Sequence, residues 1–195
     1  MTPQSVRTML AEMDMEKMTQ HSMLNHIIDG MHYLCLHRSS DVTLKLYLIE
    51  HQTNDFSGYL LHPHNHRYAF DTVVLAGGLE EIKFHECKGD EWDRHKYITE
   101  QRRFDLVGNV DLIGEAKLYR EGDHYFNDVT DIHTLRVVEG AGPVLLGLMQ
   151  FKDVAPQSNL YLPYGKPEAL KFSSSRRPNL DEILALRRRC LEMII

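Results

Sequence analysis

The sequence predicts an all-β fold with helical additions at both ends. Two patterns lead to this prediction: residues 42–151 alternate short apolar runs with turn residues, whereas both ends repeat apolar residues at helical spacing. The chain has 195 residues, of which 43% are hydrophobic and 26% are charged. This composition is typical of one globular domain and excludes a disordered or fibrous chain.

The first 41 residues are predicted to form a helical segment that packs on the β-domain. Thr2 and Pro3 are typical of a helix start, and apolar residues then recur at a spacing of three and four. A second helical pattern follows from Met23 to Leu34 and is interrupted by the polar residues 39–41.

Residues 42–151 are predicted to form the β-domain. Val42 to Leu48 alternates apolar and polar residues, which is the period of a half-buried strand. Further strand-like runs are Phe56–Leu61, Phe70–Leu75, Leu79–His85, Ala116–Arg120, Ile132–Val138 and Val144–Phe151. Many short strands separated by turn residues indicate an antiparallel sandwich or barrel.

Residues 152–195 are predicted to form a loop-rich segment and a closing helix. Several prolines interrupt any regular pattern up to Pro167. Asn179 and Glu182 then have the spacing of a capping box, in which each side chain pairs with the other residue's backbone at the helix start.

Charge and cysteine content exclude several classes of function. A net charge of -6 argues against a nucleic-acid-binding protein, because such proteins attract phosphates with a positive field. No apolar run is long enough to span a membrane. The first 30 residues include several acidic ones, whereas a signal peptide would have an apolar run there. The three cysteines, Cys35, Cys87 and Cys190, are far apart and odd in number, so we expect free thiols in a cytoplasmic protein.

Histidine is the unusual feature, with 12 in the chain and one dense stretch, His62-Pro63-His64-Asn65-His66. In a strand, residues two apart point to the same face, so His64 and His66 would lie side by side, with His62 beside them if the strand stays regular. Imidazole binds iron, zinc, copper and nickel, and a third ligand from elsewhere would complete a metal site.

At this stretch the sequence resembles the cupin superfamily. The first cupin motif places a His-x-His pair, three or four residues, an acidic residue, six residues and a glycine. Here His64-Asn65-His66 is followed either by Phe70 and Gly77 or by Asp71 and Gly78 at these spacings. Both alignments select the same histidine pair.

The second cupin motif places a glycine eleven residues before a metal-binding histidine, and Gly122 stands eleven residues before His133. The chain departs from this motif, since Asp128 and Thr130 replace its proline and second glycine and Val137 replaces its asparagine. The resemblance implies a cupin double-stranded β-helix, or jelly roll, over residues 42–151. It also implies metal ligation by His64, His66 and His133.

The acidic position decides which branch of cupins the chain resembles. With Phe70 there, the metal has three neutral histidines, as in cysteine dioxygenase-like and 3-mercaptopropionate dioxygenase-like cupins. With Asp71 there, it has the commoner three-histidine-plus-carboxylate set. Strand parity puts Phe70 on the face of His64 and His66, which favours the three-histidine set.

The resemblance implies a mononuclear non-heme Fe(II) dioxygenase that acts with dioxygen on a small polar, thiol- or amino acid-like substrate. A non-redox isomerase, decarboxylase or lyase using zinc, manganese or nickel is an alternative, which Asp71 as a fourth ligand would favour. A small-ligand-binding cupin without catalysis is another. The crosslinking cysteine of mammalian cysteine dioxygenases is missing, since the first cysteine after His66 is Cys87, and this puts cysteine as substrate in doubt. Cupin barrels often pair, which implies a homodimer.

Five further residues are candidates for work beside the metal. Tyr68 would point to the same face of the strand as the histidine pair and is a candidate catalytic residue. His62 is a second candidate catalytic residue, which could orient a metal ligand or line the mouth of the barrel. His124 and Tyr125 follow the Gly122 turn and are candidate substrate-binding residues. Arg67 could pair with a substrate carboxylate through its planar fork, although parity places it on the opposite face.

Overall fold

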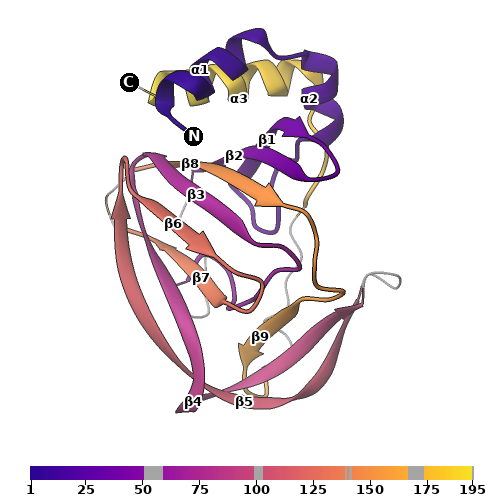
Figure 1. The fold of residues 1–195 in the computed structure, drawn as a ribbon, viewed down its shortest axis with the longest axis vertical. Helices are drawn as coiled ribbons and strands as arrows, with labels where there is room; N and C mark the ends of the chain where they lie inside the picture. Colours follow the sequence, from indigo (N-terminus) through magenta and orange to yellow (C-terminus); the bar gives the residue numbers. More distant parts are fainter. Residues whose placement is uncertain (51–58, 99–102, 139, 141, 167–173, 195) are drawn as a thin grey trace.

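The computed structural model describes residues 1–50, 59–98, 103–138, 140, 142–166 and 174–194. These residues form two antiparallel sheets, with the helices gathered on one side of the molecule (Figure 1). The helices are α1 (Pro3–Glu12), α2 (Met15–His21) and α3 (Leu180–Met193). The strands are β1 (Met31–Arg38), β2 (Val42–Ile49), β3 (Phe70–Ala76), β4 (Gly78–Ile98), β5 (Arg103–Arg120), β6 (His124–Asn127), β7 (Ile132–Val137), β8 (Val144–Phe151) and β9 (Asn159–Pro163).

The strand order is that of a jelly roll. One sheet has the order β1-β2-β8-β3-β6 and the other β5-β4-β7, with β9 beside β4. The irregular segment 59–66 runs along β7, where Leu60 N–H donates to the Leu135 carbonyl at 2.6 Å. Between β2 and β8, the segments therefore pair from the outside inward. Strand β2 pairs with β8, segment 59–66 with β7, β3 with β6, and β4 with β5. Nested antiparallel pairs of this kind define the jelly roll, which confirms the predicted fold class.

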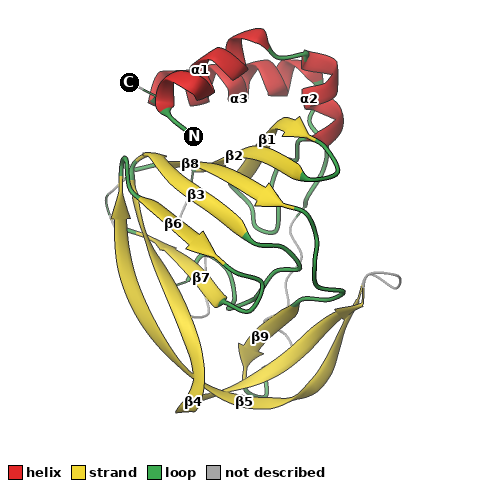
Figure 2. Cartoon of the chain, in the orientation of Figure 1, coloured by secondary structure: helices red, strands yellow, loops and turns green. Residues whose placement is uncertain are grey.

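The helices cover the outer face of the five-stranded sheet (Figure 2). Leu46 and Leu48 of β2 lie in one buried apolar cluster with Leu10 of α1 and Ile183 of α3. The predicted helix starts are confirmed: Thr2 caps α1, and Asn179 caps α3 in a capping box with Glu182.

The inner face of the same sheet lines the barrel. Tyr47 of β2, Phe70 of β3 and Tyr125 of β6 lie in a second buried cluster, together with Leu135 of β7 from the opposite sheet. The barrel interior is therefore rich in aromatic side chains, whereas the face under the helices is aliphatic.

The helix predicted from Met23 to Leu34 is wrong. Asn25 and Ile27 have φ values of 51° and 70°, and Gly30 has a φ of 78°, so the backbone there lies outside the right-handed helical region. Strand β1 then pairs with β2 from Met31 onward. Because both faces of β1 are covered, its apolar residues do not alternate with polar ones, and the sequence does not distinguish it from a buried helix.

The remaining strand predictions hold in part. Of the run predicted from Phe56 to Leu61, residues 56–58 lie outside the described residues, and residues 59–61 belong to none of the strands given above. Strands β4 and β5 are far longer than predicted, with a bulge between Glu86 and Asp90, and β9 was not predicted. None of the described helices has the length and apolar character needed to cross a membrane.

Candidate metal centre

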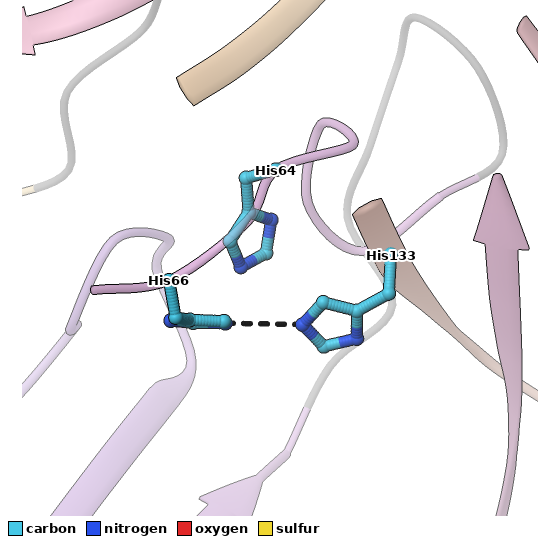
Figure 3. A group of neighbouring side chains, drawn as sticks. All are labelled: His64, His66 and His133. Atoms are coloured by element: carbon cyan, nitrogen blue, oxygen red, sulfur yellow. Dashed lines mark hydrogen bonds between the residues drawn. The ribbon is translucent and has the colours of Figure 1, made fainter. Parts of the chain in front are cut away.

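Three histidines meet inside the barrel, as the sequence predicted. His64 and His66 lie on the segment between β2 and β3, and His133 lies on β7 (Figure 3). Paired backbone hydrogen bonds join His64 to His133: the His64 N–H donates to the His133 carbonyl at 3.0 Å, and the His133 N–H to the His64 carbonyl at 2.9 Å. One ring nitrogen from each residue lies within 4.8 Å of the others.

The spacing of the nitrogens fits a single metal ion. The Nε2 atoms of His66 and His133 are 3.0 Å apart. Two ligands at right angles on a metal, each with a bond of about 2.1 Å, are about 3.0 Å apart. Two neutral imidazoles that point their lone pairs at each other are unfavourable unless a proton or a cation lies between them. The donor set and its spacing therefore fit a metal.

Burial keeps the imidazoles of His64 and His66 neutral, which is the form that binds metal. It lowers the pKa of His64 to about 3, with the neighbouring His133 adding to this effect. Burial also lowers the pKa of His66 well below its usual value. The Nδ1 of His64 lies 2.8 Å from the His62 carbonyl. As this carbonyl can only accept, it holds the proton on Nδ1 and leaves Nε2 for a metal.

Glu81 is a polar residue of the site that the sequence did not reveal. Its Oε1 lies 3.3 Å from Nδ1 of His133 and accepts a hydrogen bond of 2.5 Å from Nδ2 of Asn127. Only 2% of Glu81 is exposed. A carboxylate behind a ligating histidine orients its ring and makes it a stronger base. The signal that could have found it is a glutamate inside the apolar strand Leu79–His85.

Phe70, not Asp71, faces the histidines. The ring centroid of Phe70 lies 4.9 Å from that of His66 and 5.5 Å from that of His133. The carboxylate of Asp71 instead lies 3.8 Å from Nδ1 of His124. Within the described residues, the group of possible metal ligands contains three histidines and no carboxylate.

Both candidate catalytic residues lie beside the histidines. The Tyr68 ring centroid is 5.1 Å from that of His66, and burial raises the pKa of the Tyr68 phenol to about 12. The phenol therefore keeps its proton at neutral pH and can donate it in a hydrogen bond. His62 touches the site through its backbone carbonyl, as described above.

The three candidate substrate-binding residues lie in different places. Tyr125 is buried in the barrel, with its ring centroid 4.9 Å from that of Tyr119, and not at a rim. His124 is exposed and faces Asp71. Arg67 forms an ion pair of 2.8 Å with Asp153. No contact found for His124 or Arg67 in the described part of the chain reaches the three histidines.

The comparisons with known proteins give distant structural matches. No protein-family model matches the chain, and no curated protein matches its sequence. Among solved structures, the hydroxypropylphosphonic acid epoxidase from S. wedmorenis is 16% identical with a TM-score of 0.44, and the match covers 69% of this chain and 57% of the epoxidase. The chain thus spans little more than half of that protein.

Two shorter proteins also match. KdgF from Halomonas sp. is 13% identical with a TM-score of 0.41, covering 67% of this chain and 88% of KdgF. A cupin superfamily protein from Desulfitobacterium hafniense is 11% identical with a TM-score of 0.37, covering 62% of this chain and 76% of that protein. At such distances the chemistry of this chain has to be argued from its own side chains.

Proposed function

We propose that this chain is a metal-dependent cupin enzyme, a mononuclear non-heme Fe(II) dioxygenase that acts on a small thiol- or amino acid-like substrate. The observation that carries the proposal is the convergence of three imidazoles, His64, His66 and His133, in a group without a carboxylate. Such a set leaves Fe(II) with its full double charge and with open positions for an anionic substrate and dioxygen.

The residues of the chain around this set suit such a reaction. Bound iron would supply the activation of dioxygen next to the substrate. For a thiol, the overall reaction is RSH + O₂ → RSO₂H, in which sulfur gives four electrons to dioxygen and no outside reductant is needed. Phe70 packs against two of the ligand rings and excludes water, while Tyr68 offers a phenolic proton beside His66.

Metal analysis and oxygen uptake test the proposal. Protein purified without added metal, then loaded with Fe(II), should bind about one iron per chain and consume oxygen with a member of a panel of small thiols and amino acids. His64→Ala, His66→Ala and His133→Ala should each abolish both properties. His85→Ala is the matched control, because His85 is exposed on β4.

Other outcomes would contradict the proposal in different ways. Tight binding of zinc, manganese or nickel without oxygen uptake would point to a non-redox cupin such as an isomerase, decarboxylase or lyase. Ligand binding without turnover would point to a binding protein. An unchanged metal content in His133→Ala would show that the third ligand is another residue.

A further inference from the structure

Asn127, the last residue of β6, makes a polar contact between the two sheets of the barrel. It belongs to the five-stranded sheet, whereas Glu81 on β4 and His133 on β7 belong to the opposite sheet. The Nδ2 of Asn127 donates to Oε1 of Glu81 at 2.5 Å, and the two residues are only 0% and 2% exposed. Because a carboxylate oxygen can only accept, the side-chain amide of Asn127 has to present its NH₂ group to Glu81.

One oxygen of Glu81 faces two donors, and the two contacts are unequal. The same Oε1 lies 3.3 Å from Nδ1 of His133 and 2.5 Å from Nδ2 of Asn127. A charge-assisted N–H···O bond is about 2.7–2.9 Å long, so the contact with His133 is longer than a strong hydrogen bond of this kind. Among the described residues, Nδ1 of His133 has no hydrogen-bond partner of good geometry. Asn127 therefore holds the carboxylate more closely than His133 does.

The backbone fixes Asn127 from two directions. Within the sheet, Asn127 pairs with Phe70, whose ring centroid lies 5.5 Å from that of His133. The turn that follows Asn127 leads into β7 and is closed by two aspartates. The Asp128 N–H donates to Oδ2 of Asp131 at 3.0 Å, and the Asp131 N–H donates to the Asp128 carbonyl at 3.1 Å. The position of Asn127 relative to His133 is thus set by the strand and the turn, so the amide can act as an anchor for the carboxylate.

The distance between Glu81 and His133 controls how much negative charge reaches a bound metal. A carboxylate that draws the Nδ1 proton of a histidine toward itself makes the ring a better electron donor at Nε2. In His133, Nε2 is the atom that lies 3.0 Å from Nε2 of His66, on the side of the metal site. A more strongly donating ligand favours the more positive ion, which for iron is Fe(III). Because Asn127 competes for the same oxygen, its N–H donor weakens this effect.

We propose that Asn127 is a positioning residue of the metal centre, which holds Glu81 back from His133 and so keeps a bound iron in the Fe(II) state. The inference rests on the proposed function, since this balance matters to the reaction only if the metal is redox-active. The overall reaction with a thiol contains no outside reductant, so an iron that was oxidised to Fe(III) between turnovers would not be recovered. A site that disfavours Fe(III) avoids this loss.

Two substitutions with opposite effects test this role without relying on turnover. Asn127→Leu removes the competing donor and lets Glu81 approach His133, so the Fe(III)/Fe(II) reduction potential should fall. Glu81→Gln removes the negative charge, so the potential should rise. Each shift should correspond to roughly a 10-fold change in the equilibrium between the two oxidation states, or about 59 mV. A redox titration of the iron-loaded protein without substrate, followed by the EPR signal of Fe(III), measures the potential. Loss of packing alone would not move the two variants in opposite directions.

A double variant shows whether Asn127 acts through Glu81. Asn127→Leu combined with Glu81→Gln should have the potential of Glu81→Gln alone, because Asn127 then has no charge to hold. Asn109→Leu is the matched control and should leave the potential unchanged. Asn109 is exposed on β5 and donates the same type of hydrogen bond to Glu91, at 3.3 Å. If Asn127→Leu does not fold, Asn127→Ser replaces it, since the shorter side chain also lacks the amide donor.

The outcomes separate this role from the dioxygenase itself. An unchanged or higher potential in the Asn127 variant would overturn the role of Asn127, even in a protein that consumes oxygen with a thiol. A double variant whose potential differs from that of Glu81→Gln would also overturn it. Potentials that shift in the expected directions in a protein without oxygen uptake would keep the role and contradict the dioxygenase. A wild-type protein that binds no iron would overturn both.

Discussion

The two faces of the five-stranded sheet differ although they are built from the same strands. On β2, Leu46 and Leu48 point to the helices, whereas Tyr47 points into the barrel and Lys45 contacts its ring. The outer face buries aliphatic side chains, which stabilise the fold by about 25 cal/mol per Å² removed from water. The inner face buries the phenols of Tyr47 and Tyr125 and packs against the imidazoles of His26 and His66, polar groups that lose hydration unless they find partners.

This difference separates the work of the two faces. The outer face holds the fold together, and the inner face holds polar groups in place for chemistry. Because side chains alternate along a strand, a change of one residue in position moves a substitution from one role to the other. The following predictions test this separation, beginning with the largest effect.

Removing a side chain under the helices should affect folding but not the metal centre. Ile183→Ala should lower the free energy of unfolding by about 2–5 kcal/mol, because Ile183 is 0% exposed and its loss leaves a cavity between α3 and the sheet. Urea unfolding of the metal-free protein measures this. Leu184→Ala, at a position that is 38% exposed on the same helix, should have a much smaller effect. A loss of metal binding in folded Ile183→Ala would contradict the separation.

The inner face should make stability depend on pH. Burial lowers the pKa of His26 to about 4 and that of His64 to about 3, so between pH 6.5 and 4 the unfolded chain binds more protons than the folded one. Stability of the metal-free protein should be complete above pH 6.5 and fall as the pH drops to 4. The part due to His26 is on the order of 3 kcal/mol.

Urea unfolding at pH 7, 6, 5 and 4 checks this prediction. His26→Phe should make the decline with falling pH shallower, because the variant has one buried imidazole fewer. A wild-type protein whose unfolding free energy stays constant over this range would show that these imidazoles are solvated in the native state.

Glu81 should matter through His133 and not through folding. Glu81→Gln removes the negative charge behind the ring and should weaken metal binding by roughly 10- to 100-fold. Competition with a coloured chelator measures the metal affinity. Glu80→Gln is the matched control. The carboxylate of Glu80, next to Glu81 in the sequence, forms an ion pair with Arg136 instead of lying against His133. Equal losses of metal affinity in the two variants would show that Glu81 has no specific role at the site.

How far the sequence predicted this molecule depends on the range of the interaction. Local signals succeeded: Asn179 and Glu182 are three residues apart, and their capping box is present. The grouping of His64 and His66 with His133 was also predicted, although these residues are distant in the sequence. The prediction was possible because the two motifs that carry them occur together in cupins and identify two segments that pair in the fold. Strand parity correctly separated Phe70 from Asp71.

Interactions that depend on the packing of distant segments were not predictable. Glu81 gains its role only because β4 lies beside β7, and the sequence shows it as one of two adjacent glutamates. The sequence predicts Lys45 on the polar side of a half-buried strand. In the structure, β1 and β8 flank this strand on its two edges. A strand that is central in a sheet and covered on both faces has no solvent side, so its polar residues have to be explained individually.

The smallest effect is expected at the start of α3, one of the helices that cover the outer face of the five-stranded sheet. Asn179→Ala removes the side-chain acceptor of the Glu182 N–H and should cost about 1 kcal/mol in unfolding free energy. Asn179→Ser keeps an acceptor and should be near neutral. Metal content should not change in either variant. Because the buried side chains of α3 lie in the apolar cluster on the outer face, a changed metal affinity in Asn179→Ala would show that the sheet transmits strain between its two faces.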